Sequence, residues 1–190
     1  MSESIGAEPG RRFGWSNMFV SPEEDPRTDG GFAGERAVLV GYLRDQRLTL
    51  ELKCSGLDPT ALARRSVEPS NLSLLGLVRH MAGVEQKWFR QVMAGQDVRV
   101  HYRSGGDRDG DFNGAVPDPD VVAEAWATWR AEVAFAERFV AEASDVGVTG
   151  AMGQESIQLR EVLVHMIEEY ARHNGHADFL RERIDGRIGQ

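Results

Sequence analysis

Side chains that could bind a metal ion are concentrated in one segment of the chain, residues 158–184. His165, Glu169, His173 and His176 follow one another at intervals of four, four and three residues. In an α-helix this spacing places side chains on one face, so the four groups would point in a similar direction. Imidazole suits zinc, nickel and iron, and a carboxylate can complete such a ligand set. The segment therefore predicts one half of a metal site.

The surrounding pattern indicates that this face is turned towards the core. Core positions recur in steps of four and three along the segment, which is typical of a helix packed in a bundle. His173 occupies one of these positions. Burying imidazole and carboxylate groups is costly unless they are paired, and a divalent cation removes that cost by coordinating them. The core line runs through Leu159, Leu163, Met166, Tyr170, His173, Ala177, Leu180 and Ile184.

A second predicted helix, residues 73–94, supplies a partner from elsewhere in the chain. His80 lies at the edge of its buried stripe, between Leu77 and Val84. Glu169 and His173 are one helical turn apart, so both can reach one ion. His80 would then complete the ligand set from the other helix. Two histidines and one carboxylate leave coordination positions open, which favours a catalytic over a structural site.

Two features of this site stay open. His165 or His176 could replace Glu169 as the third ligand, and His176 could instead hold a ligand in position. The donor set suits zinc, nickel or ferrous iron without selecting one. The alternative to a metal is a hydrogen-bonded network of core histidines.

The rest of the chain predicts an all-α protein, a four-helix bundle. Residues 1–31 are rich in glycine, proline and charge, which indicates an irregular N-terminal arm before a bundle over 32–187. Residues 96–117 read as a long loop, and 144–155 as turns in which residues 146–148 could form a minor strand. Apolar periodicity and helix-end signals predict helices at 33–53, 58–63, 73–94, 118–143 and 158–184.

Composition narrows the class of protein. The 190 residues carry a net charge of −8, which argues against general nucleic-acid binding. The single cysteine, Cys54, cannot form an internal disulfide and fits a reducing compartment; we expect a buried structural thiol. We find no apolar run of membrane-spanning length and no secretory signal. We therefore expect a cytoplasmic protein with no membrane or nucleic-acid partner.

Two segments resemble the DinB/YfiT-like superfamily. Residues 74–89, with the run LLGLVRHMAGVE followed by Trp88-Phe89, are similar to its first metal-histidine helix. Residues 165–178, HMIEEYARHNGHAD, are similar to its last helix. The closest branch is that of the actinobacterial mini-circle proteins, and the resemblance covers about residues 32–187.

The resemblance implies a four-helix bundle, often a homodimer, with a divalent metal held by three side chains. By position these are His80, Glu169 and His173, and His176 stands where many members have glutamine. Glu169 stands where many members have histidine. A His/Glu/His set resembles that of the mycothiol-dependent maleylpyruvate isomerases of the same superfamily.

The resemblance also implies an activity. Members include S-transferases and isomerases that use mycothiol, bacillithiol or glutathione. A metal-bound thiolate would attack an electrophilic small molecule, with the 96–117 loop as a wall of the substrate pocket. The alternative functions are a non-catalytic stress-response bundle that binds a metal or small molecule, and a purely structural dimer.

Overall fold

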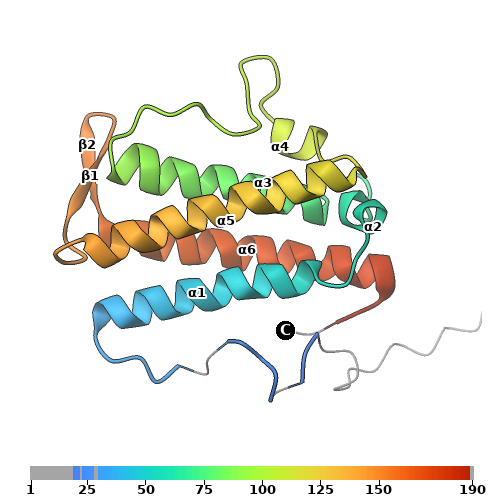
Figure 1. The fold of residues 1–190 in the computed structure, drawn as a ribbon, viewed down its shortest axis with the longest axis horizontal. Helices are drawn as coiled ribbons and strands as arrows, with labels where there is room; N and C mark the ends of the chain where they lie inside the picture. The colour runs from blue at the N-terminus through green and yellow to red at the C-terminus, as the bar shows by residue number, and fades with distance from the viewer. Residues whose placement is uncertain (1–18, 22, 28–29, 189–190) are drawn as a thin grey trace, which may run out of the picture.

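The computed structural model describes residues 19–21, 23–27 and 30–188, which form a mainly helical chain with one small hairpin (Figure 1). The mainly helical prediction is therefore confirmed. The helices are α1 (Glu35–Cys54), α2 (Pro59–Ala63), α3 (Leu74–Glu85) with its π-helical continuation η2 (Gln86–Met93), α4 (Gly110–Asn113), α5 (Pro119–Glu142) and α6 (Leu159–Asp185). The strands are β1 (Thr149–Met152) and β2 (Glu155–Gln158), which pair antiparallel.

The helix ends follow from short-range chemistry in the sequence. The Ser73 hydroxyl accepts a hydrogen bond from the backbone N–H of Gly76 at the start of α3, and the Asp118 carboxylate accepts one from Asp120 at the start of α5. These bonds satisfy backbone donors that a helix leaves unpaired in its first turn. At the other end of α6, Gly186 has a φ of 77°, a conformation that glycine adopts without strain.

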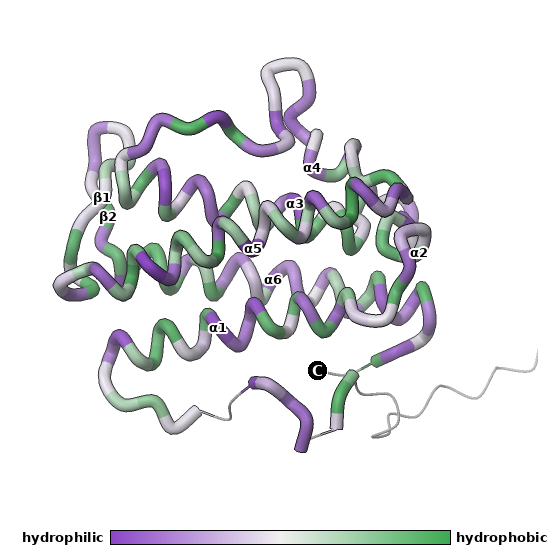
Figure 2. The backbone as a smooth tube through the Cα atoms, in the orientation of Figure 1, coloured by the Kyte–Doolittle hydropathy of each residue, from purple (hydrophilic) through white to green (hydrophobic). Residues whose placement is uncertain are grey.

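Within the described residues, the four long helices pack in two close pairs. Helix α1 lies along α6 and α3 along α5, and α3 also contacts α6 (Figure 1). Figure 2 shows hydrophobic and hydrophilic residues alternating along each helix, as expected when one face is buried. The core is aliphatic and aromatic, and its fully buried members include Leu50, Leu74, Leu77, Met81, Phe89, Leu159, Leu163, Met166 and Tyr170.

Three local elements differ from the prediction. The helix expected over 73–94 is π-helical from Gln86 onward, and Trp88, Phe89, Val92 and Met93 of this part are buried. A minor strand was expected at 146–148, but the hairpin spans Thr149–Gln158. The predicted 96–117 loop contains the short helix α4. All three elements depend on contacts between distant parts of the chain, which the spacing of apolar residues does not reveal.

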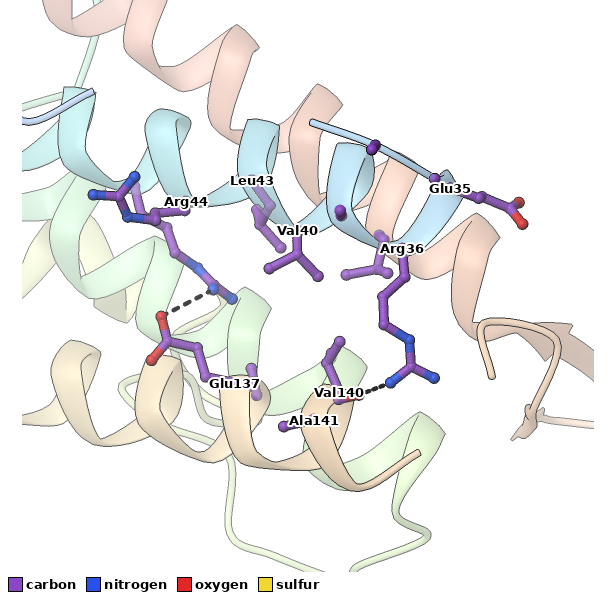
Figure 3. A pocket seen from close by; sticks show the side chains of 14 residues that line it. Glu35, Arg36, Val40, Leu43, Arg44, Glu137, Val140 and Ala141 are labelled. Atoms are coloured by element: carbon purple, nitrogen blue, oxygen red, sulfur yellow. Dashed lines mark hydrogen bonds and ion pairs between the residues drawn. The ribbon is translucent and has the colours of Figure 1, made fainter. Parts of the chain in front are cut away.

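A cavity of about 710 Å³ separates α1 from α5 (Figure 3). Arg36 crosses it and donates to the backbone carbonyls of Val140 and Ala143, at 2.9 and 2.7 Å. Farther along α1, Arg47 Nη1 lies 3.8 Å from Glu137 Oε1 of α5. The walls between these bridges are mostly apolar, and none of the lining residues is a histidine.

One buried carboxylate connects all four long helices. Arg47 of α1 donates two hydrogen bonds of 2.8 Å to Glu85 of α3, whose side chain is fully buried. Tyr170 of α6 donates to the same carboxylate at 2.8 Å, and Trp129 of α5 donates to the Tyr170 oxygen at 2.8 Å. Burial, together with the Glu85 charge, raises the pKa of the Tyr170 phenol well above its usual value, so its hydroxyl remains a donor.

The predicted irregular arm, residues 1–31, falls partly outside the described residues, at 1–18, 22 and 28–29. Its described part contains no helix or strand. The Phe19 ring lies 4.7 Å from the Lys53 ammonium and 4.9 Å from the Arg181 guanidinium, so the end of the arm contacts both α1 and α6. None of the helices among the described residues is long and apolar enough to cross a membrane.

We expect Glu85→Ala to lower the free energy of unfolding by about 3–5 kcal/mol, because it leaves the buried Arg47 charge without its partner. Chemical denaturation would measure this. The matched control is Glu137→Ala, which removes a 57% exposed partner of the same arginine and should cost less than about 1 kcal/mol. Equal losses in the two variants would contradict the role assigned to Glu85.

Candidate metal centre

Helices α3 and α6 bring His80, Glu169 and His173 together. Each offers one ligand atom, and these three atoms lie within 4.8 Å of one another. The His80 and His173 ring centroids are 4.6 Å apart, and His173 Nε2 lies 3.5 Å from a Glu169 oxygen. Two imidazoles and one carboxylate at this separation form a donor set that fits a divalent transition metal. The three residues singled out in the sequence are thus neighbours in space.

The two alternative ligands flank this cluster. His165 Nε2 lies 3.3 Å from the other Glu169 oxygen, and the centroid of its ring lies 4.6 Å from that of Trp88, with the two rings tilted by 59°. His176 Nδ1 lies 3.4 Å from His173 Nδ1. His176 therefore contacts the ring edge of His173 that faces away from Glu169. This position suits an orienting partner of His173 better than a third ligand.

His173 stays neutral over a wide pH range. Burial, together with the positive charges of His80, His176 and Arg172, lowers the pKa of its imidazole to about 3. Only the neutral ring has a lone pair to give to a metal. Burial of position 173 therefore keeps the side chain in its coordinating form.

An acidic residue from the 96–117 loop supports His80. Asp111 Oδ2 lies 2.9 Å from His80 Nδ1, and the Asp111 side chain is 2% exposed. Arg103 donates to the same oxygen from Nε and Nη2, at 3.0 and 2.8 Å. Burial raises the pKa of the Asp111 carboxyl, but the hydrogen bonds from His80 and Arg103 and their charges outweigh it and hold the pKa below its usual value.

Close packing between α4 and α3 fixes Asp111. At Gly110 a Cβ atom would stand 2.1 Å from the Tyr102 carbonyl oxygen, so only glycine permits the loop to fold back this tightly. Arg79 of α3 donates to the backbone carbonyls of Gly110 and Asp111, at 3.0 and 2.8 Å. The Phe112 ring packs against Gly76 of α3. The aspartate is therefore held through its backbone as well as its side chain.

A cavity of about 300 Å³ opens beside His80 and Glu169. Helix residues form one side, including Trp88 and His165. Residues of the 96–117 segment, Asp111 among them, also line it. The expectation that residues 96–117 wall the site agrees with this arrangement, in which the loop contributes Val100, His101, Arg103 and Asp111 to the lining.

The sequence did not reveal the loop partners of His80. Asp111 could be considered only as one of several alternating acids, and Arg103 had no distinguishing pattern. The nearest signal was Gly110 before Asp111 and Phe112, a small residue before an apolar one in a polar loop.

Cys54 is buried as expected, and burial raises the pKa of its thiol to about 12.

The shifted pKa of His173 predicts a pH dependence of stability. Between about pH 6.5 and 3 the unfolded chain binds a proton at this position that the folded chain does not, so stability falls as the pH falls. His173→Gln should reduce the loss of unfolding free energy between pH 7 and 4.5 by about 2–3 kcal/mol. Denaturation with a chelator present measures it. The control is His165→Gln, whose side chain is 35% exposed; the same reduction there would contradict the interpretation.

The comparison with known families agrees with these observations. A family model described as mycothiol-S-transferase matches residues 38–186, which include most of α1, all of α3, α5 and α6, and all three clustered side chains. No curated protein matches the chain in sequence. The match spans most of the 190 residues and supports the DinB-like resemblance, so the chain belongs to the mycothiol S-transferase family.

Proposed function

We propose that the protein is a metal-dependent enzyme in which His80, Glu169 and His173 bind one divalent cation. Its reaction is the transfer of a low-molecular-weight thiol to an electrophilic small molecule, or the isomerisation of such a molecule with the help of the same thiol. Mycothiol is the first candidate for the thiol. The observation that carries the proposal is the set of three donor atoms within 4.8 Å, at the edge of a cavity, in a member of this family.

The charges of the cluster support a thiol ligand. Two neutral imidazoles and one carboxylate leave a divalent cation with one positive charge that a thiolate can cancel. A bound cation of this kind would lower the pKa of a coordinating thiol and so supply thiolate at neutral pH. The chain's own task is then to hold its donor groups. Glu169 provides the negative charge, and the low pKa of His173 keeps that ring unprotonated.

The shape of the site supports a small electrophile. The cavity of about 300 Å³ is at the lower end of the range for small-molecule sites. A second cavity of about 440 Å³, lined by Ser104, Gly105 and Arg108, shares Val100 and Arg103 with it. We place the reacting thiol and the electrophile in the first cavity and the polar remainder of the thiol compound along the second.

The proposal extends to the whole chain. Residues 32–187 form one four-helix bundle of the DinB type, supported by the α1–α6 and α3–α5 pairs. The protein acts as a homodimer in the cytoplasm, without a nucleic-acid partner. Zinc, nickel and ferrous iron all fit the ligand set, and metal analysis selects among them.

Metal content tests the site. The wild-type protein should bind about one equivalent of a divalent metal, and His80→Ala and His173→Ala should lose it, because each removes one of three ligands. Elemental analysis after dialysis measures this. His101→Ala is the matched control, since His101 lines the same cavity but lies outside the cluster. Full metal binding by His80→Ala would refute the ligand assignment.

Thiol transfer tests the activity. The metal-loaded wild-type protein should conjugate mycothiol to small electrophiles, and His80→Ala should reduce the rate at least about 100-fold, as expected when a site loses its metal. Mass spectrometry of the conjugate measures it, with bacillithiol and glutathione run in parallel. A metal-loaded protein that conjugates none of the three thiols would favour a non-catalytic binding bundle.

A further inference from the structure

Two loop side chains contact the same ring nitrogen of His80. Asp111 Oδ2 lies 2.9 Å from His80 Nδ1, and Arg103 Nη2 lies 3.0 Å from that atom. The two loop residues also pair with each other, through the Arg103 hydrogen bonds to Asp111. His80, Asp111 and Arg103 are therefore each in contact with the other two, and the contacts to His80, a candidate metal ligand, are made at its Nδ1 atom.

A neutral imidazole can satisfy only one of these contacts with a hydrogen bond. It carries one N–H group and one lone pair on its two nitrogens, whereas a carboxylate only accepts and a guanidinium only donates. Donation from Nδ1 to Asp111 leaves the lone pair on Nε2. Acceptance at Nδ1 from Arg103 places the proton on Nε2. The two loop residues thus favour opposite tautomers of His80.

We propose that this pair controls metal binding at His80: Asp111 is a positioning residue that holds the ring with Nε2 free to coordinate, and Arg103 is an internal cation that competes with the metal. Because the loop engages Nδ1, Nε2 is the atom left for the ion. The inference rests on the proposed metal site but needs no assumption about the thiol or the reaction.

The two partners differ in how firmly they are held. Asp111 is buried, and Arg79 binds its backbone carbonyl at 2.8 Å. The Arg103 side chain is 45% exposed and lines both the cavity at His80 and the neighbouring one. The guanidinium therefore has space to leave Nδ1, whereas the carboxylate does not. When metal binds at Nε2, the contact with Asp111 persists and the contact with Arg103 is lost.

Charge acts in the same direction as the tautomer. A guanidinium next to His80 repels a divalent cation on the same ring, and the carboxylate of Asp111 attracts it. Linkage requires the effect to be reciprocal. If binding of the ion weakens the contact between Arg103 and His80, that contact lowers the affinity for the ion by the same factor. Substitutions of the two partners should therefore change metal affinity with opposite signs.

Zinc affinity of the full chain, measured by competition with a chromophoric chelator, tests this expectation. Asp111→Asn should weaken zinc binding by roughly 10–100-fold, the usual effect of losing the partner of a ligating histidine. Arg103→Met removes the charge and the donors but keeps an unbranched side chain, and it should bind zinc more tightly; unchanged affinity would contradict the competing role of Arg103. Asp109→Asn makes the same chemical change as the first variant at an exposed position of the same loop and should leave affinity unchanged.

The sign of the Arg103→Met effect separates this role from a structural one. If the pair only anchored the loop, both variants would weaken zinc binding alike, and that result would overturn the proposal. A wild-type protein that binds no zinc, nickel or iron would instead reject the metal site itself, and this inference with it.

The tautomer of His80 provides a second readout that needs no Asp111 variant. Long-range ¹H–¹⁵N spectra of histidine-labelled wild-type protein with zinc should show His80 protonated at Nδ1 and bound through Nε2. In Arg103→Met the Nδ1–H tautomer should dominate before zinc is added. Zinc on Nδ1, or a proton on Nε2 in the loaded protein, would overturn the proposal.

Discussion

A carboxylate buried among four helices must find all its partners inside the protein, and at Glu85 this requirement links the four long helices. Arg47 supplies the countercharge, and Tyr170 supplies a further hydrogen bond. Glu85 follows His80 by five residues on α3, and Tyr170 is adjacent to Glu169 on α6. The network that satisfies one buried acid therefore joins α3 and α6, the helices that carry the clustered His80, Glu169 and His173.

The candidate site combines two kinds of support. The candidate ligands are on the long helices α3 and α6, whereas the groups that contact His80 Nδ1 come from residues 96–117 between helices. Rigid ligands with adjustable outer partners are a common division in metal sites, because the outer partners tune affinity and solvent access. The loop also walls the cavity, so the segment that contacts His80 is the one that a substrate would meet.

The spacing of apolar residues predicted structure well in the long helices, where buried positions recur at every turn. The helices appeared close to their predicted bounds, since their buried faces and end signals are local in sequence. The same reasoning placed His173 on an inward line, and that residue is nearly buried, with 12% of its side chain exposed. It could not find Asp111, because no spacing rule connects a loop aspartate to a helix 31 residues earlier. It also missed the π-helical turn of η2, which depends on how large side chains fit a particular neighbour.

The sequence by itself determined where the four long helices form and which of their faces are buried, and hence that His80, Glu169 and His173 turn inward. Hydrophobic patterning and helix-end chemistry act over a few residues, so they can be read along the chain. The tertiary structure alone decided that the three groups meet, that Glu85 joins four helices and that Arg103 and Asp111 share one nitrogen of His80. Those contacts bring together distant parts of the chain, and their geometry depends on the packing of the whole core.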